Sequence, residues 1–217
     1  MNKAIFVLIF IHAFFITHAE LIEFEFGGEV TSLHGIYQSP WNQVQTGNEW
    51  SISYVFESTT PDTFPIDELQ ERLGSYDKSI KGYELTVGSV TVSDSSDSGI
   101  GSIHIYNGYP TGYDQYEVLI SLPTEMAIGP WFMQLDDYTD SAWSTDALPL
   151  CGDIDLENFK IKDFHILIDD LSGSEIMGVV EYHQCRIVPE PATLSLLVLG
   201  SLIMRHRKRS KAFGTTV

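Results

Sequence analysis

The chain has 217 residues, of which 30 are acidic and 12 basic, and its formal net charge is −18. So strongly acidic a surface repels nucleic acid phosphates and anionic lipid headgroups, which excludes both as partners of the folded part. The length allows one domain with a sizeable core.

The first nineteen residues are organised like a secretory signal peptide. Lys3 precedes a mainly apolar stretch (residues 4–16), and the segment ends in Thr17-His18-Ala19. A basic start, a short apolar stretch and small residues at its end are typical of such signals. We predict cleavage between Ala19 and Glu20. An uncleaved membrane helix is the alternative, but the apolar stretch is shorter than the ~20 residues that a span prefers.

After Glu20, apolar and polar residues alternate over many short segments. Alternation with a period of two, in stretches rich in β-branched and aromatic residues, is typical of strands with one buried face. A Gly88-Ser89 centre predicts a tight hairpin with a type II′ turn. The predicted strands lie at residues 22–26, 50–54, 83–92, 103–106, 116–122, 164–168 and 176–182.

A single short helix is predicted, from Pro65 to Leu73. Many short strands with almost no helix indicate an all-β fold. We expect an antiparallel β-sandwich over residues 20–187, with a jelly roll as one form of it and a barrel as the main alternative. The absence of an internal sequence repeat argues against a propeller or a solenoid.

Cys151 and Cys185 are the only cysteines, and both lie in the part predicted to be exported. An oxidising compartment and an even count favour a disulfide between them, closing a loop of about 35 residues. Two separate buried thiols are the alternative. A catalytic cysteine is not expected, because neither neighbouring sequence resembles a protease signature.

Carboxylates gather in the predicted loops, and Asp153, Asp155 and Glu157 occupy alternate positions. Oxygen-rich loops can hold Ca²⁺, which makes these three a weak calcium candidate. The spacing does not match an EF-hand loop, so solvated loop acids are the favoured interpretation. We expect no cofactor.

Tryptophans can stack on sugar rings, and paired carboxylates can act on a glycoside. Trp50 lies in a strand pattern and is expected in the core. Trp41 and Trp143 lie in loop-like sequence, so we expect them to be exposed and name them as candidates for sugar stacking. Neither a Gly-x-Ser-x-Gly elbow nor a phosphate loop occurs, and we expect no catalysis.

The C-terminal region has a second signal. Val188 and Pro189-Glu190-Pro191 precede an apolar run (residues 192–204). The two prolines close the folded domain, and thirteen apolar residues make about 20 Å of helix, short against a hydrocarbon core of ~30 Å. We predict a transient membrane helix, whose basic cytoplasmic end is Arg205, Arg207, Lys208 and Arg209.

These C-terminal features, over residues 188–217, resemble the PEP-CTERM sorting signal. The resemblance implies that an exosortase, a membrane-embedded cysteine protease, recognises Pro189, Glu190 and Pro191. It also implies a Gram-negative bacterium, and such bacteria usually make extracellular polysaccharide. The body of the chain, for example Asp146 to Pro149, loosely resembles segments common in PEP-CTERM proteins, and these segments imply no activity.

We therefore expect a non-enzymatic protein that the Sec translocon exports. It is held briefly in the inner membrane and then resides at the cell surface or in the extracellular matrix, associated with polysaccharide or biofilm. A carbohydrate-binding module of the same architecture is the first alternative. A secreted hydrolase acting on glycans is the second, and it would require two carboxylates in a cleft.

Overall fold

A computed structural model describes residues 20–35, 39–63, 73–95, 100–108, 112–123, 130–139, 141–169 and 173–189. The predicted signal peptide and the C-terminal segment, with its helix at residues 192–204, lie outside these ranges. So does the predicted helix at Pro65 to Leu73, except Leu73, which begins a strand. No helix within the described ranges is both long and apolar enough to cross a membrane.

The described chain consists mainly of antiparallel strands. They are β1 (Leu21–His34), β2 (Glu49–Glu57), β3 (Leu73–Val87), β4 (Val90–Asp94), β5 (Gly101–Tyr106), β6 (Asp114–Ser121), β7 (Pro130–Asp137), β8 (Ile161–Asp169) and β9 (Ser174–Val188), with the short 3-10 helices η1 (Trp41–Gln43) and η2 (Leu156–Asn158). The all-β prediction is confirmed.

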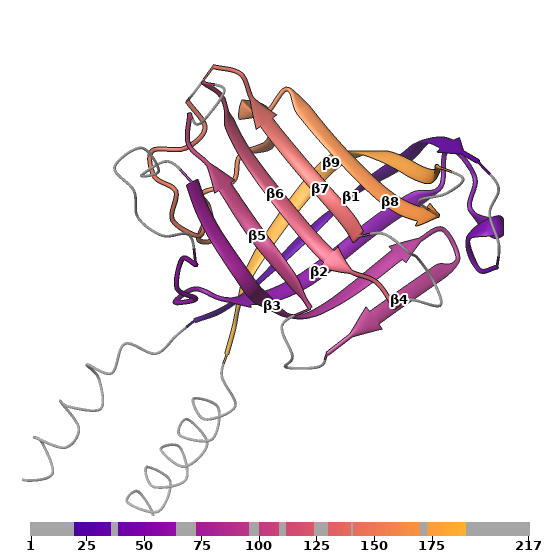
Figure 1. Ribbon diagram of the computed structural model, residues 1–217, viewed down its shortest axis with the longest axis horizontal. Coiled ribbons are helices and arrows are strands. Elements are labelled where there is room, and N and C mark those ends of the chain that lie inside the picture. Colours follow the sequence, from indigo (N-terminus) through magenta and orange to yellow (C-terminus); the bar gives the residue numbers. More distant parts are fainter. Residues whose placement is uncertain are drawn as a thin grey trace, which may run out of the picture.

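Eight of these strands form one closed sheet, in the order β2-β1-β9-β8-β7-β6-β5-β3, and β3 pairs back with β2 (Figure 1). Closure depends on β3, which is 15 residues long and pairs with β5 along its first half and with β2 along its second. The ninth strand, β4, extends from β3 as a hairpin around Gly88. The expected sandwich is therefore wrong, because a single sheet closes on itself instead of two sheets packing face to face.

The interior of the barrel is filled with side chains. The interior of an eight-stranded barrel is narrow enough for inward side chains to fill it. Large aromatic and aliphatic residues from every barrel strand are fully buried there, among them Phe24, Phe26, Tyr54, Phe56, Tyr116, Trp131, Met133, Leu135, Phe164 and Ile176.

Two buried carboxylates help to close the end of the barrel at which β9 ends. Asp114 and Asp137 face each other on β6 and β7. Asp114 accepts a hydrogen bond of 2.8 Å from the Trp143 backbone N–H, and Asp137 accepts from the backbones of Thr139 and Ser141. Burial alone would raise the pKa of Asp137, but the hydrogen bonds outweigh it and lower the pKa to about 2.

These bonds hold the closing segment (residues 141–160) over the barrel end. Trp143 contacts Tyr116 in the barrel and Phe159 in the segment, with ring centroids 6.1 and 5.7 Å apart. The predicted disulfide between Cys151 and Cys185 is present, with a Cα–Cα distance of 5.4 Å, and it links the segment to β9. The segment is thus fixed by hydrogen bonds, packing and a covalent bond.

Candidate functional site

The two tryptophans predicted to stack on sugars are buried. Trp41 is 1% exposed and Trp143 is 9% exposed, and both belong to the hydrophobic core. The prediction of exposure is wrong because these loops fold back over the barrel, and the large apolar rings fill the space beneath them. Neither ring face is available to a sugar.

The weak calcium candidate consists of residues that cap their own backbone. Asp153 accepts a hydrogen bond from the Leu150 N–H, and Asp155 accepts from the Glu157 N–H at the start of η2. No three His, Cys, Asp or Glu side chains in the described part of the chain converge as metal ligands. The structure gives these acids a local structural role.

A row of hydrogen-bond acceptors crosses the outer face of β6, β7 and β8. Glu117 lies opposite Gln134 in the sheet, and Gln134 lies opposite Asp163. Directly opposed side chains have Cβ atoms about 5 Å apart, so the two carboxylates flank the amide at a mutual distance of about 10 Å. We call Glu117, Gln134 and Asp163 the acceptor row.

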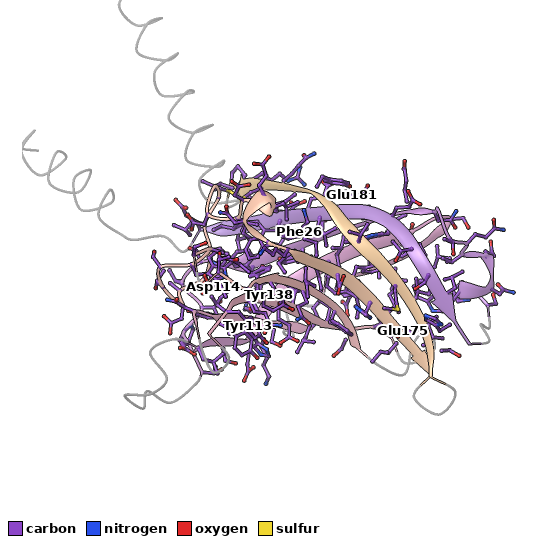
Figure 2. The ribbon with its side chains drawn as sticks, turned by 90° about the horizontal axis from the view of Figure 1, so that it is seen from above. Phe26, Tyr113, Asp114, Tyr138, Glu175 and Glu181 are labelled. Atoms are coloured by element: carbon purple, nitrogen blue, oxygen red, sulfur yellow. A yellow bond between two sulfur atoms is a disulfide. The ribbon has the colours of Figure 1, made fainter. Side chains whose placement is uncertain are left out.

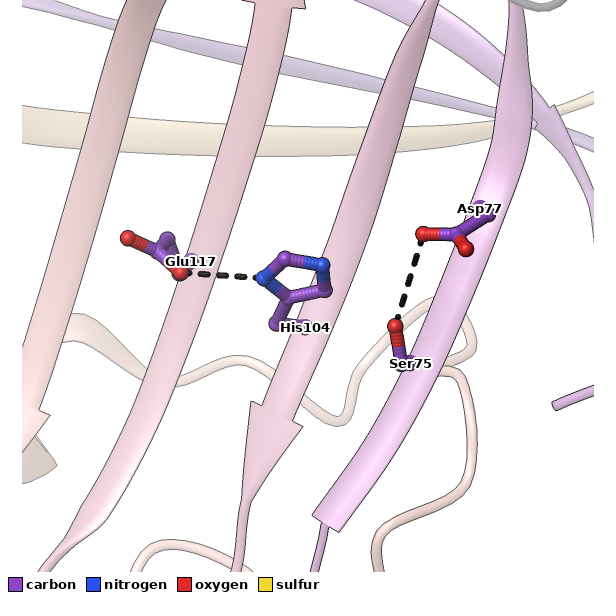
Figure 3. Close-up of polar contacts among 4 residues, drawn as sticks. All are labelled: Ser75, Asp77, His104 and Glu117. Atoms are coloured by element: carbon purple, nitrogen blue, oxygen red, sulfur yellow. Dashed lines mark hydrogen bonds and ion pairs between the residues drawn. The ribbon is translucent and has the colours of Figure 1, made fainter. Parts of the chain in front are cut away.

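Glu117 is held in place by the neighbouring strand. His104 on β5 lies directly opposite it, and the Nδ1 atom of His104 is 3.0 Å from Oε2 of Glu117 (Figure 3). On the far side of His104, the Ser75 hydroxyl donates to Asp77 across 3.5 Å (Figure 3). The polar surface therefore continues from the acceptor row on to β5 and β3.

Gln134 is oriented by a buried carboxylate two residues later on the same strand. Its Nε2 atom donates to both oxygens of Asp136, at 2.9 and 2.8 Å. An ionised carboxylate can only accept hydrogen bonds, so the amide nitrogen must face Asp136 and the amide oxygen is turned away as an acceptor. Asp136 is only 3% exposed, and this burial raises its pKa. Asp136 thus positions Gln134 and has little surface to offer a ligand.

Three tyrosines border the acceptor row: Tyr106, Tyr113 and Tyr138. Tyr113 and Tyr138 pack edge to face with ring centroids 5.5 Å apart, and Tyr138 is 53% exposed (Figure 2). Local desolvation, followed by the charges of Asp136 and Asp163, raises the pKa of Tyr138. Desolvation and the charge of Glu117 do the same for Tyr106. The phenol groups therefore lie among the carboxylates.

The outward face of strands β5 to β8 carries negative charge. The outward positions of β5 to β8 in register with the acceptor row include Glu117, Asp136 and Asp163, but no Lys or Arg. Lys162 on β8 points elsewhere, and its ammonium lies 3.4 Å from the Leu156 carbonyl oxygen. The face can accept hydrogen bonds and attract cations, and its exposed rings can stack on flat apolar surfaces.

A second histidine–glutamate pair lies further along the same outer surface. His165 on β8 contacts Glu175 on β9 through Nδ1, and its ring stacks on Phe132 with centroids 4.3 Å apart. Both pairs join neighbouring strands and therefore also stabilise the sheet. Sequence reasoning missed this entire face because the register that aligns the strands is not visible in the chain itself.

Comparison with protein-family models, with curated proteins and with solved structures found no match to this chain. The resemblance of residues 188–217 to a sorting signal therefore stays a prediction.

Proposed function

We propose that this chain is an exported surface protein, sorted by an exosortase, whose barrel binds polysaccharide through the outer face of β5–β8. The observation that carries the binding proposal is the packed Tyr113–Tyr138 pair, in which Tyr138 is exposed, four residues along the chain from Glu117 and Gln134. Sugars combine apolar C–H faces, which pack on aromatic rings, with hydroxyl groups, which donate to carboxylate and amide oxygens. The face offers both kinds of contact within a few strands.

Binding to a glycan array tests this proposal, with the full-length chain and two single variants. Tyr138→Ala removes the exposed ring, and Gln134→Leu removes the central acceptor; each is expected to weaken glycan binding about tenfold or more, as central contacts do. Tyr182→Ala is the matched control, because Tyr182 is also exposed, at 38%, but lies on β9. The proposal fails if no glycan binds, or if both face variants bind as well as the control.

Binding is favoured over hydrolysis by the burial of Asp136. A glycosidase needs a carboxylic acid with a raised pKa that reaches the glycosidic oxygen. Asp136 has the raised pKa, but it is nearly inaccessible and both of its oxygens accept from Gln134. The expectation of no catalysis stays a prediction, which incubation of bound glycans with the protein and analysis for shortened products would test.

The sorting proposal is supported by the pairing of the first and last strands. Leu21 on β1 lies opposite Val188 on β9, so both strands leave the barrel at the same end (Figure 1). Glu20 and Pro189, which adjoin the two predicted signals, are thereby neighbours in space. This arrangement suits a precursor in which both apolar signals must reach one membrane.

Replacing Pro189-Glu190-Pro191 by three alanines in the native host tests the sorting proposal. We expect an uncut precursor retained in the membrane, detected as a larger band in the membrane fraction. Replacing Gly214-Thr215-Thr216 by alanines is the control and should leave processing intact. Normal processing of the Pro-Glu-Pro variant would refute exosortase recognition.

A further inference from the structure

The chemistry of the acceptor row restricts what a bound glycan can be. All three members present oxygen atoms that accept hydrogen bonds, so the ligand must supply the donors. A hydroxyl group supplies one neutral donor, whereas a protonated amine supplies three donors and a positive charge. A hydrogen bond is about twice as strong when its donor or acceptor is ionised, and an ammonium group on a carboxylate adds the attraction of opposite charges.

The net charge of the protein also favours a cationic ligand, and it acts over a longer range than a hydrogen bond does. The segment from residue 20 to residue 191 holds all 30 acidic residues and six basic ones, a formal charge of −24. Uronic acid polymers would be repelled by this surface and cationic polymers attracted to it. Exposed tyrosine rings add to the attraction, since the face of an aromatic ring binds cations.

We propose that the acceptor row selects polysaccharides of amino sugars whose amino groups are free and protonated. This inference rests on the proposed polysaccharide binding and names its ligand class. Glu117 and Asp163 bind ammonium groups of the polymer, and Gln134 accepts from a hydroxyl between them. Tyr113 and Tyr138 pack on the sugar rings, so an acetylated polymer binds through the same face but without the ionic contacts.

Titration of the full-length chain with glucosamine oligomers, and with their fully N-acetylated counterparts, tests the inference at a pH where the amines are protonated. At low ionic strength we expect the free-amine oligomer to bind about tenfold more tightly, because its ammonium groups can form ion pairs with Glu117 and Asp163. Added salt should reduce this preference, because exposed charges are screened.

Paired variants separate the acceptor row from the general charge of the protein. Glu117→Gln/Asp163→Asn should abolish the preference for free amines and keep the binding of the acetylated oligomer. Glu49→Gln/Glu84→Gln removes the same charge from exposed positions on β2 and β3, and should keep the preference. Strand β2 is not a neighbour of β6, β7 or β8 in the sheet, and Glu84 lies in the half of β3 that pairs with β2.

Several results would overturn the inference. Equal affinity for both oligomers would overturn the preference for free amines and leave the proposed polysaccharide binding intact. If neither oligomer and no arrayed glycan bound, the preference and the proposed polysaccharide binding would both be overturned. If the Glu49/Glu84 variant also lost the preference for free amines, the net charge of the protein would be its cause. Poly-lysine of matched length is a further comparison. If it bound as tightly as the free-amine oligomer, and if the Glu117/Asp163 variant weakened both ligands equally, the face would be a general site for polycations.

Discussion

The hydroxyl groups of Tyr54 and Tyr116 lie 2.5 Å apart inside the barrel, where both side chains are fully buried. They reach each other from β2 and β6, which are not neighbours in the sheet. Burial, followed by the interaction with Tyr116, raises the pKa of Tyr54 well above its usual value. The pair is therefore neutral, and each hydroxyl depends on the other for its hydrogen bond across the core.

Removing both of these hydroxyls should cost less than the sum of the two single removals. Tyr54→Phe or Tyr116→Phe leaves a buried polar group unsatisfied and is expected to lower the free energy of unfolding by about 1 to 3 kcal/mol. The double variant should lose clearly less than the sum of the two. Urea unfolding of all four proteins gives the coupling energy, and strictly additive losses would show that the hydroxyls do not interact.

Asp137 should matter more to stability than an exposed carboxylate with a similar local role. Asp137→Asn replaces a carboxylate that accepts from Thr139, Ser141 and Ala142, and we expect a loss of about 2 to 3 kcal/mol. Asp155→Asn is the control, since asparagine caps a helix as well as aspartate does. Equal unfolding midpoints for the two variants would contradict a central role for Asp137.

The disulfide should contribute strongly to the stability of the barrel end. Cys151 and Cys185 are separated by 34 positions, and opening a loop of that length costs about 3 to 4 kcal/mol in the chain-entropy estimate. Cys151→Ser/Cys185→Ser is expected to lower the melting temperature accordingly. Reducing agent should lower the melting temperature of the unaltered protein and leave the variant unchanged. An unaltered protein insensitive to reduction would disprove the contribution.

Acid should destabilise the fold through His183. This ring packs against Phe24 and Phe26, with centroids 4.9 and 4.6 Å away, and burial lowers its pKa to about 4. Above the unfolded pKa of about 6.5 both states are neutral, and stability is unaffected. As pH falls from 6.5 to 4, the unfolded chain binds a proton that the folded protein does not, so stability decreases.

His183→Phe should remove this part of the pH dependence. Because the ring is partly exposed, we discount the full effect to about 1 to 2 kcal/mol between pH 6.5 and 4. Unfolding free energies of both proteins across this range give the contribution of His183 directly, since other titrating groups cancel in the difference. Parallel curves would mean that His183 titrates alike in the folded and unfolded states.

Local patterns predicted at least part of most strands, and two of the stretches they missed have identifiable reasons. In β7, Phe132 lies outward between the buried Trp131 and Met133, so consecutive apolar residues hide the period of two. In the first half of β3, the pairing with β5 is interrupted between Tyr76 and Ile80, and Lys78 has a positive φ of 57°. Such an irregularity breaks the alternation on which a strand prediction depends.

The sequence by itself determined the all-β class, the hairpin at Gly88 and the disulfide between Cys151 and Cys185. The two terminal signals stay predictions. The all-β class and the hairpin follow from local sequence patterns, and the disulfide follows from the presence of only two cysteines. The tertiary structure alone decided that the sheet closes into a barrel, because alternation is the same in a barrel and a sandwich. It also buried Trp41 and Trp143, and it aligned Glu117, Gln134 and Asp163, since strand register depends on contacts between residues far apart in the chain.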